Sequence, residues 1–143
     1  MEGLAAILTG PFWGKWADRS SRAVLRSSMM LVAILLATVV TYASMAGGDL
    51  ANQIFFPVLL FLLGAAHAGV RVGRKTYLVN MAEGNERSDY VSVGNTLIGV
   101  LLIVAGILTG LASLISVSVA FAIFAVCALA GALYGKRLPS VSQ

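Results

Sequence analysis

The residues with the clearest potential for chemistry are Gly14, Asp18, Arg19 and Arg22, which lie close together in the segment GKWADRSSR at residues 14–22. Asp18 carries a carboxylate, and the two guanidinium groups beside it could pair with it or with carbonyl groups at the ends of neighbouring helices. The serines that follow are typical helix N-caps, so the segment predicts a short turn between two helices. Asp18 would then lie near the positive end of the second helix dipole, and Gly14 would let another helix approach closely. A merely solvated basic loop would explain the arginines but not the spacing of Gly14 and Asp18.

The composition places this turn in a membrane protein. Of the 143 residues, 59% are hydrophobic and 11% are charged, whereas soluble domains carry about 25% charged residues. Runs of about 17–25 apolar residues can cross a hydrocarbon core of about 30 Å. In lipid such a run has to be helical, because its backbone must satisfy its own hydrogen bonds. We therefore predict an all-α membrane protein with four full transmembrane helices, at residues 24–44, 54–70, 91–111 and 115–134.

The basic residues predict the orientation of these helices. The ten lysines and arginines fall into three clusters, which lie at the start of the first span, after the second span and after the fourth. The two other connections, MAGGDLANQ and LASLIS, contain neither Lys nor Arg. By the positive-inside rule, a chain that crosses at every span has all three clusters in the cytoplasm. We expect a multi-pass protein of the inner or plasma membrane that is surrounded by lipid, does not bind nucleic acid, and has a cytoplasmic tail at residues 135–143.

The first residues are apolar but too few for a span. Residues 3–14 would reach only about 18 Å as a helix, so we predict a partial helix over residues 1–16 and a cytoplasmic loop over residues 17–23. Either an upstream helix is missing from this sequence, or the segment is a half-span packed against its neighbours. Glu2 then lies at membrane depth or at the far interface. It is explained either by an accidental start site or by a proton-coupling role, because acids inside a membrane are usually functional.

Enzymatic chemistry has no support in the sequence. A single cysteine, Cys127, and a single histidine, His67, are too few for a metal cluster. The segment GVRVGRKT at residues 69–76 lacks the glycine-to-lysine spacing of a phosphate-binding loop, and no strand precedes it. We therefore predict no catalytic residues, no cofactor and no metal.

Glycines predict where two helices pack closely. Gly106 and Gly110 are four residues apart in the third full span, a spacing that lets membrane helices approach one another. We expect packing against a neighbouring helix there, with sliding at a gate as an additional role.

The segment at residues 14–22 resembles the signature loop G-x-x-x-D-R-x-G-R of the major facilitator superfamily. Gly14, Asp18, Arg19 and Arg22 match this pattern, and Ser21 stands where the family usually has Gly. After this loop the family has four more spans and a short tail in each six-helix half, as this chain has. The resemblance implies that the chain forms part of a six-helix bundle. It corresponds to the end of helix eight through helix twelve of a twelve-helix transporter.

The resemblance also implies a function. In that family the loop is a latch whose ionic contacts hold the cytoplasmic gate in one state, so Gly14, Asp18, Arg19 and Arg22 would form a gating loop. The helices equivalent to residues 54–70 and 91–111 partly line the substrate cavity. The chain would transport a small solute by alternating access together with a missing N-terminal helical bundle, and we do not expect transport by this chain alone. The alternative is a small standalone oligomeric membrane protein or scaffold without transport activity. The polar candidates for the cavity are His67, Asn95 and Thr96, for which a plain hydrogen bond between helices is the alternative.

Overall fold

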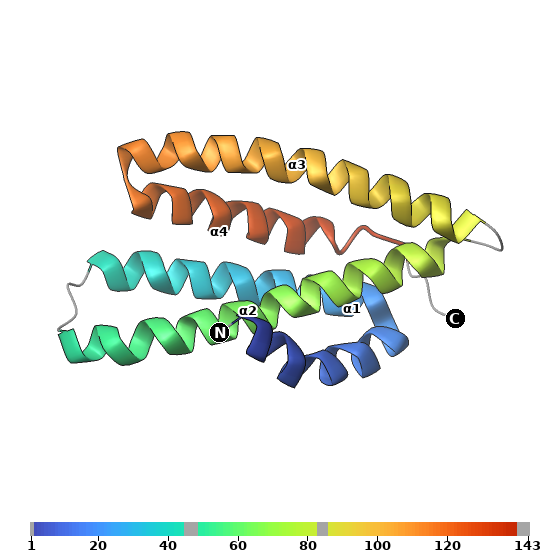
Figure 1. Ribbon diagram of the computed structural model, residues 1–143, viewed down its shortest axis with the longest axis horizontal. Coiled ribbons are helices and arrows are strands. Elements are labelled where there is room, and N and C mark those ends of the chain that lie inside the picture. Colours follow the sequence, from blue (N-terminus) through green and yellow to red (C-terminus); the bar gives the residue numbers. More distant parts are fainter. Residues whose placement is uncertain (1, 45–48, 83–85, 140–143) are drawn as a thin grey trace.

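The computed structural model forms a bundle of long helices (Figure 1). It describes residues 2–44, 49–82 and 86–139, without the side chains of residues 2, 43, 44 and 49–51. All regular structure in these ranges is helical, and its elements are α1 (Glu2–Ser44), α2 (Asp49–Met81), α3 (Arg87–Ile115) and α4 (Val117–Tyr134).

All four helices are long and apolar enough to cross a membrane, which confirms the predicted all-α membrane fold. The helices extend beyond the predicted spans. The 33 residues of α2 correspond to about 50 Å at 1.5 Å per residue, well over the thickness of a hydrocarbon core. Its last turns and the first turns of α3 therefore form the polar segment that follows the second span. Between α3 and α4 only Ser116 is not helical, and its Oγ accepts a hydrogen bond from the Ser118 N–H at 3.2 Å.

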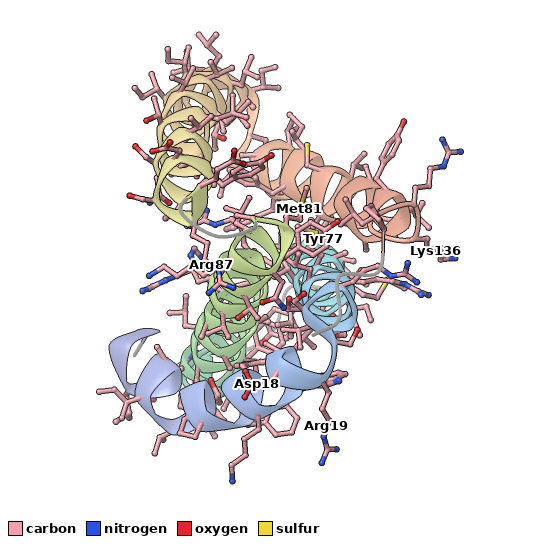
Figure 2. The ribbon with its side chains drawn as sticks, turned by 90° about the vertical axis from the view of Figure 1, so that its right-hand side faces the viewer. Asp18, Arg19, Tyr77, Met81, Arg87 and Lys136 are labelled. Carbon is pink, nitrogen blue, oxygen red and sulfur yellow. The ribbon has the colours of Figure 1, made fainter. Side chains whose placement is uncertain are left out.

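The first helix consists of two segments that meet at Ser20. The backbone of Ser20 is extended (φ −162°, ψ 93°), and its Oγ accepts a hydrogen bond from the Ala23 N–H at 3.2 Å. Ser20 is thus the N-cap of the second segment, as the serines in this position predict. Residues 2–19 of the first segment correspond to about 27 Å of helix, compared with about 18 Å for the apolar residues 3–14 alone. Figures 1 and 2 place this first segment and α3 on opposite sides of the bundle.

The bundle is held mainly by the contact between α1 and α2. A Cβ atom on Gly69 would lie 2.8 Å from the Trp13 ring and 2.9 Å from the Ser28 Cβ, and one on Gly73 would lie 3.0 Å from the Leu25 backbone nitrogen. The two glycines are four residues apart and let both segments of α1 touch the backbone of α2. Trp13 and Ser28 are buried in this contact.

The glycines of α3 do not pack in this way. Among the described residues, no other helix comes within 4 Å of a Cβ added at Gly106 or Gly110, so the expected packing at this pair is not formed within this chain. The spacing is correct for close packing, but no helix of the described residues faces it. In α3 Ala112 alone among the described residues is buried, and large apolar side chains are exposed along its length.

We expect Gly69→Ala to destabilise the chain, because the added methyl group collides with the rigid Trp13 ring. Overpacking of this kind costs about 1–3 kcal/mol, which thermal unfolding of the purified chain in detergent will detect. Gly106→Ala is the matched control, because it fills open space and improves helix propensity by up to about 1 kcal/mol. Equal melting temperatures for the two variants would contradict this packing.

Candidate functional site

The turn at Ser20 lies at the same end of the bundle as the tail that follows α4. The Arg22 guanidinium donates a hydrogen bond from Nη1 to the Leu138 carbonyl at 2.7 Å. The buried Tyr77 of α2 donates a hydrogen bond from its hydroxyl to the Pro139 carbonyl at 3.3 Å. These two contacts attach the backbone of the tail to both α1 and α2.

Asp18 and Arg19 lie at the end of the first segment of α1, and both side chains are exposed. Arg19 points away from the other helices in Figure 2. Within the described residues neither side chain has a hydrogen bond or an ion pair, so the pairing of Asp18 with an arginine is not formed in this conformation. Asp18 also precedes the N-cap by two residues, because the chain bends at Ser20. Among the described residues Arg22 does donate to a carbonyl group, but this is Leu138 in the tail and not a carbonyl at the end of a helix, as was predicted.

The close helix approach expected at Gly14 is not formed within the described part of the chain. No atom of another helix there lies within 4 Å of the position that a Gly14 Cβ would occupy. Close contact is made instead by the preceding Trp13, and the glycine that permits it is Gly69 on the opposite helix. Trp13 stacks on Trp16, with ring centroids 5.6 Å apart and an angle of 9° between the planes. The aromatic rings thus support the first segment of α1 just before the turn.

The three cavity candidates are exposed, but they do not form one cluster. His67 lies on α2, and Asn95 and Thr96 lie near the start of α3. The neighbouring Gly94 faces Leu78, whose Cδ1 would lie 2.9 Å from a Cβ there. Leu78 is eleven positions beyond His67, or about 17 Å along the helix. The Thr96 hydroxyl donates to the Ser92 carbonyl at 3.0 Å within its own helix.

Two features of this end are absent from the sequence-based prediction. Tyr77 and the tail carbonyls lie near the turn because α2 continues well past residue 70. An estimate of span length does not reveal this continuation.

The helix α1 begins at Glu2, but the Glu2 side chain lies outside the described residues, so its proton-coupling role stays a prediction.

Four long apolar helices in an up-and-down bundle, with basic turns gathered at one end, define a multi-pass helical membrane protein. The chain belongs to the Major Facilitator Superfamily, because the sequence profile of that family matches residues 2–141. This confirms the resemblance to the family that the loop and the helix count suggested. Membership implies transport of a solute across a membrane. Comparisons with curated proteins and with solved structures gave no match.

We expect Arg22→Gln to release the tail, because the charge-assisted hydrogen bond to Leu138 is lost. For a half-buried contact this corresponds to tryptic cleavage after Arg137 that is about five- to tenfold faster, measured by mass spectrometry of the peptides. Arg19→Gln is the matched control, since this exposed arginine does not touch the tail. Equal acceleration in both variants would show that charge in the loop, and not this contact, governs cleavage.

Proposed function

We propose that this chain is the C-terminal part of a transporter that moves a small solute by alternating access. In this mechanism two helical bundles rock around a binding site near the middle of the membrane. The observation that carries the proposal is the family match over residues 2–141, together with the loop motif at the bend of α1. The partner is a second, N-terminal bundle that this chain does not contain.

The gating role of the loop is supported by two exposed charges that have no partner among the described residues. Asp18 and Arg19 are exposed at the bend with no partner among the described residues, so both charges are available to a contact outside this chain. Arg22 is already engaged with the tail. Contacts that form in one conformation and not in the other shift an equilibrium by their difference in free energy. We assign this role to Asp18 and Arg19, while Arg22 holds the turn against the tail and Gly14 is the remaining residue of the gating-loop motif.

The exposed apolar side chains of α3 support the proposal that a second bundle packs against this chain. The apolar side chains on α3 are exposed on several sides, which fits a helix that contacts lipid on one side and another bundle on the other. His67, Asn95 and Thr96 would line the cavity at different depths, and Glu2 would carry a proton at the far end of the first segment. Without the second bundle such a cavity has only one wall, so we expect this chain alone to be inactive.

We propose that the end with the turn at Ser20 and the tail faces the cytoplasm of a cell with this protein in its plasma or inner membrane. The three basic clusters lie at this end, as the positive-inside rule requires of cytoplasmic segments.

Two serines at the ends of α3 test this orientation. In a Cys127→Ser background, a membrane-impermeant maleimide should label Ser113→Cys in intact cells, because this position lies at the end without basic residues. Ser88→Cys, which lies beside Arg87, should be labelled only after the membrane is permeabilised. Both side chains are exposed, so access to the reagent decides the result. Labelling of Ser88→Cys alone in intact cells would reverse the orientation, and labelling of both would rule out a span.

In the transporter expressed with its upstream bundle, Asp18→Asn should slow solute uptake by about fivefold or more, since coupling between conformational states is worth about 1–3 kcal/mol. It should also change the maleimide reactivity of a cysteine placed at Thr96. Lys15→Gln is the control, because it removes a charge one turn earlier. Proteoliposomes that hold this chain alone should give only background flux. Undiminished uptake with unchanged reactivity would remove the latch role, and saturable flux by the chain alone would contradict the two-bundle mechanism.

A further inference from the structure

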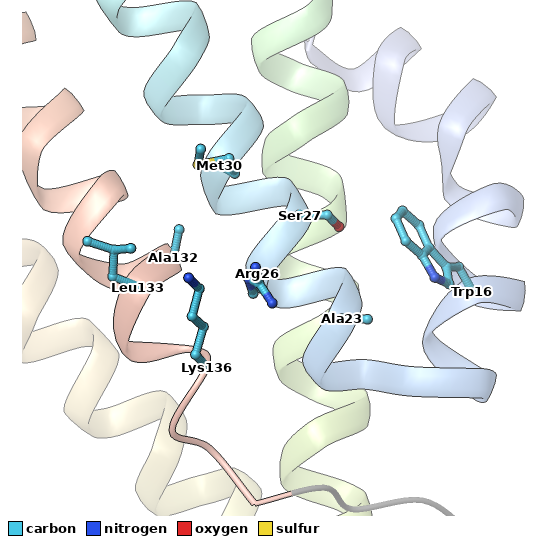
Figure 3. A pocket seen from close by; sticks show the side chains of 8 residues that line it. All are labelled: Trp16, Ala23, Arg26, Ser27, Met30, Ala132, Leu133 and Lys136. Carbon is cyan, nitrogen blue, oxygen red and sulfur yellow. The ribbon is translucent and has the colours of Figure 1, made fainter.

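A pocket of about 370 Å³ opens between the second segment of α1 and the end of α4. Figure 3 shows Arg26 from α1 and Lys136 from the residues after α4 on its wall, with Trp16 from the first segment of α1 at its edge. Both cationic side chains are exposed. No acidic residue lines this pocket, and neither cation has an ion pair among the described residues. The pocket therefore presents two uncompensated positive charges.

An apolar groove continues from this pocket along the same pair of helices. Met30 lines both the pocket and a second cavity of about 270 Å³, whose wall is otherwise made of aliphatic side chains. The groove lies between α1 and α4, and it runs from the cationic end at Arg26 towards Ala37, away from the end with the turn. Its other lining residues are Ala33, Ile34, Ala37, Ala125, Val126 and Leu129.

The length of the groove matches one leaflet of a bilayer. From Arg26 to Ala37 the helix rises about 17 Å at 1.5 Å per residue, and half of a hydrocarbon core is about 15 Å. Ala33, Ala37 and Ala125 have small side chains, which leave the groove open to an extended acyl chain. The cationic end lies at the end of the bundle that holds the turn at Ser20, and Trp16, of a residue type common at membrane interfaces, lines the same pocket.

We propose that this pocket and groove bind one anionic phospholipid. Its phosphate group lies between Arg26 and Lys136, and one acyl chain lies along the groove past Met30 to Ala37. Basic pockets between helices at the membrane surface suit anionic headgroups, because charge attraction adds to the burial of the chain. A soluble anion would use only the cationic end, whereas a phospholipid uses both the charges and the apolar groove. The site is separate from the proposed cavity residues, so it does not depend on the transport mechanism.

Native mass spectrometry of the full chain in detergent tests this site, with phosphatidylglycerol as the probe and phosphatidylcholine as the zwitterionic reference. The wild-type chain should retain one phosphatidylglycerol in preference to phosphatidylcholine. The double variant Arg26→Gln and Lys136→Gln should lose this preference, with affinity falling by about fivefold for each charge removed. Arg137→Gln should keep it, because this neighbouring arginine lies over the Tyr134 ring and outside the pocket lining.

A second pair of variants tests the groove. Ala37→Phe fills it and should weaken binding of phosphatidylglycerol severalfold, whereas Thr38→Phe, at the next exposed position outside the groove lining, should not. Equal loss in Arg137→Gln and in the double variant would overturn the site, since it would mean that total charge alone attracts the lipid. Displacement of the lipid by millimolar inorganic phosphate, or no effect of Ala37→Phe, would overturn the lipid as the occupant.

Discussion

The structure depends on the backbone contact between α1 and α2. Gly69 and Gly73 have no side chains to hold the helices apart, and the Trp13 ring and Ser28 occupy the space beside Gly69. Because Trp13 lies before the bend and Ser28 after it, one pair of glycines holds both segments of α1. In a membrane, where lipid is as apolar as the helix surface, such shape complementarity provides much of the attraction between helices. The position of the turn at Ser20, and so of its charges, follows from this contact.

Charge organises the other part of the molecule. The bases of the turn, of α2 and of the tail collect at one end, and each group there has a different environment. Arg22 is bound to the tail, Arg19 at the bend has no partner among the residues that the structure describes, and Arg26 and Lys136 share a pocket. The same basic end thus holds a structural contact, the charge that we propose for gating and the surface that we propose for an anionic headgroup.

Much of the architecture was predictable from the sequence, because burial in lipid leaves few choices. Apolar runs free of charge had to be helices, and a serine after Arg19 was expected to cap the second segment, although the sequence did not decide between Ser20 and Ser21. The packing partners were not predictable in this way. Gly106 and Gly110 have the same spacing as Gly69 and Gly73, but which pair meets a helix depends on how α1 folds back. Whether Asp18 has an ion-pair partner likewise depends on the exact residue at which the helix bends. The α1–α4 pocket forms only when the two helices are brought together.

The one-residue connection between α3 and α4 has a consequence for how the protein is made. With only Ser116 outside the helices, the two helices have too little chain between them to cross the bilayer independently. They must enter as a helical hairpin, with a tip that carries no charge and passes through the hydrocarbon at low cost. The side on which Arg87 is retained during synthesis then also decides where Lys136 emerges. The side of the membrane on which the start of α3 is held during insertion thereby fixes the orientation of the last two helices.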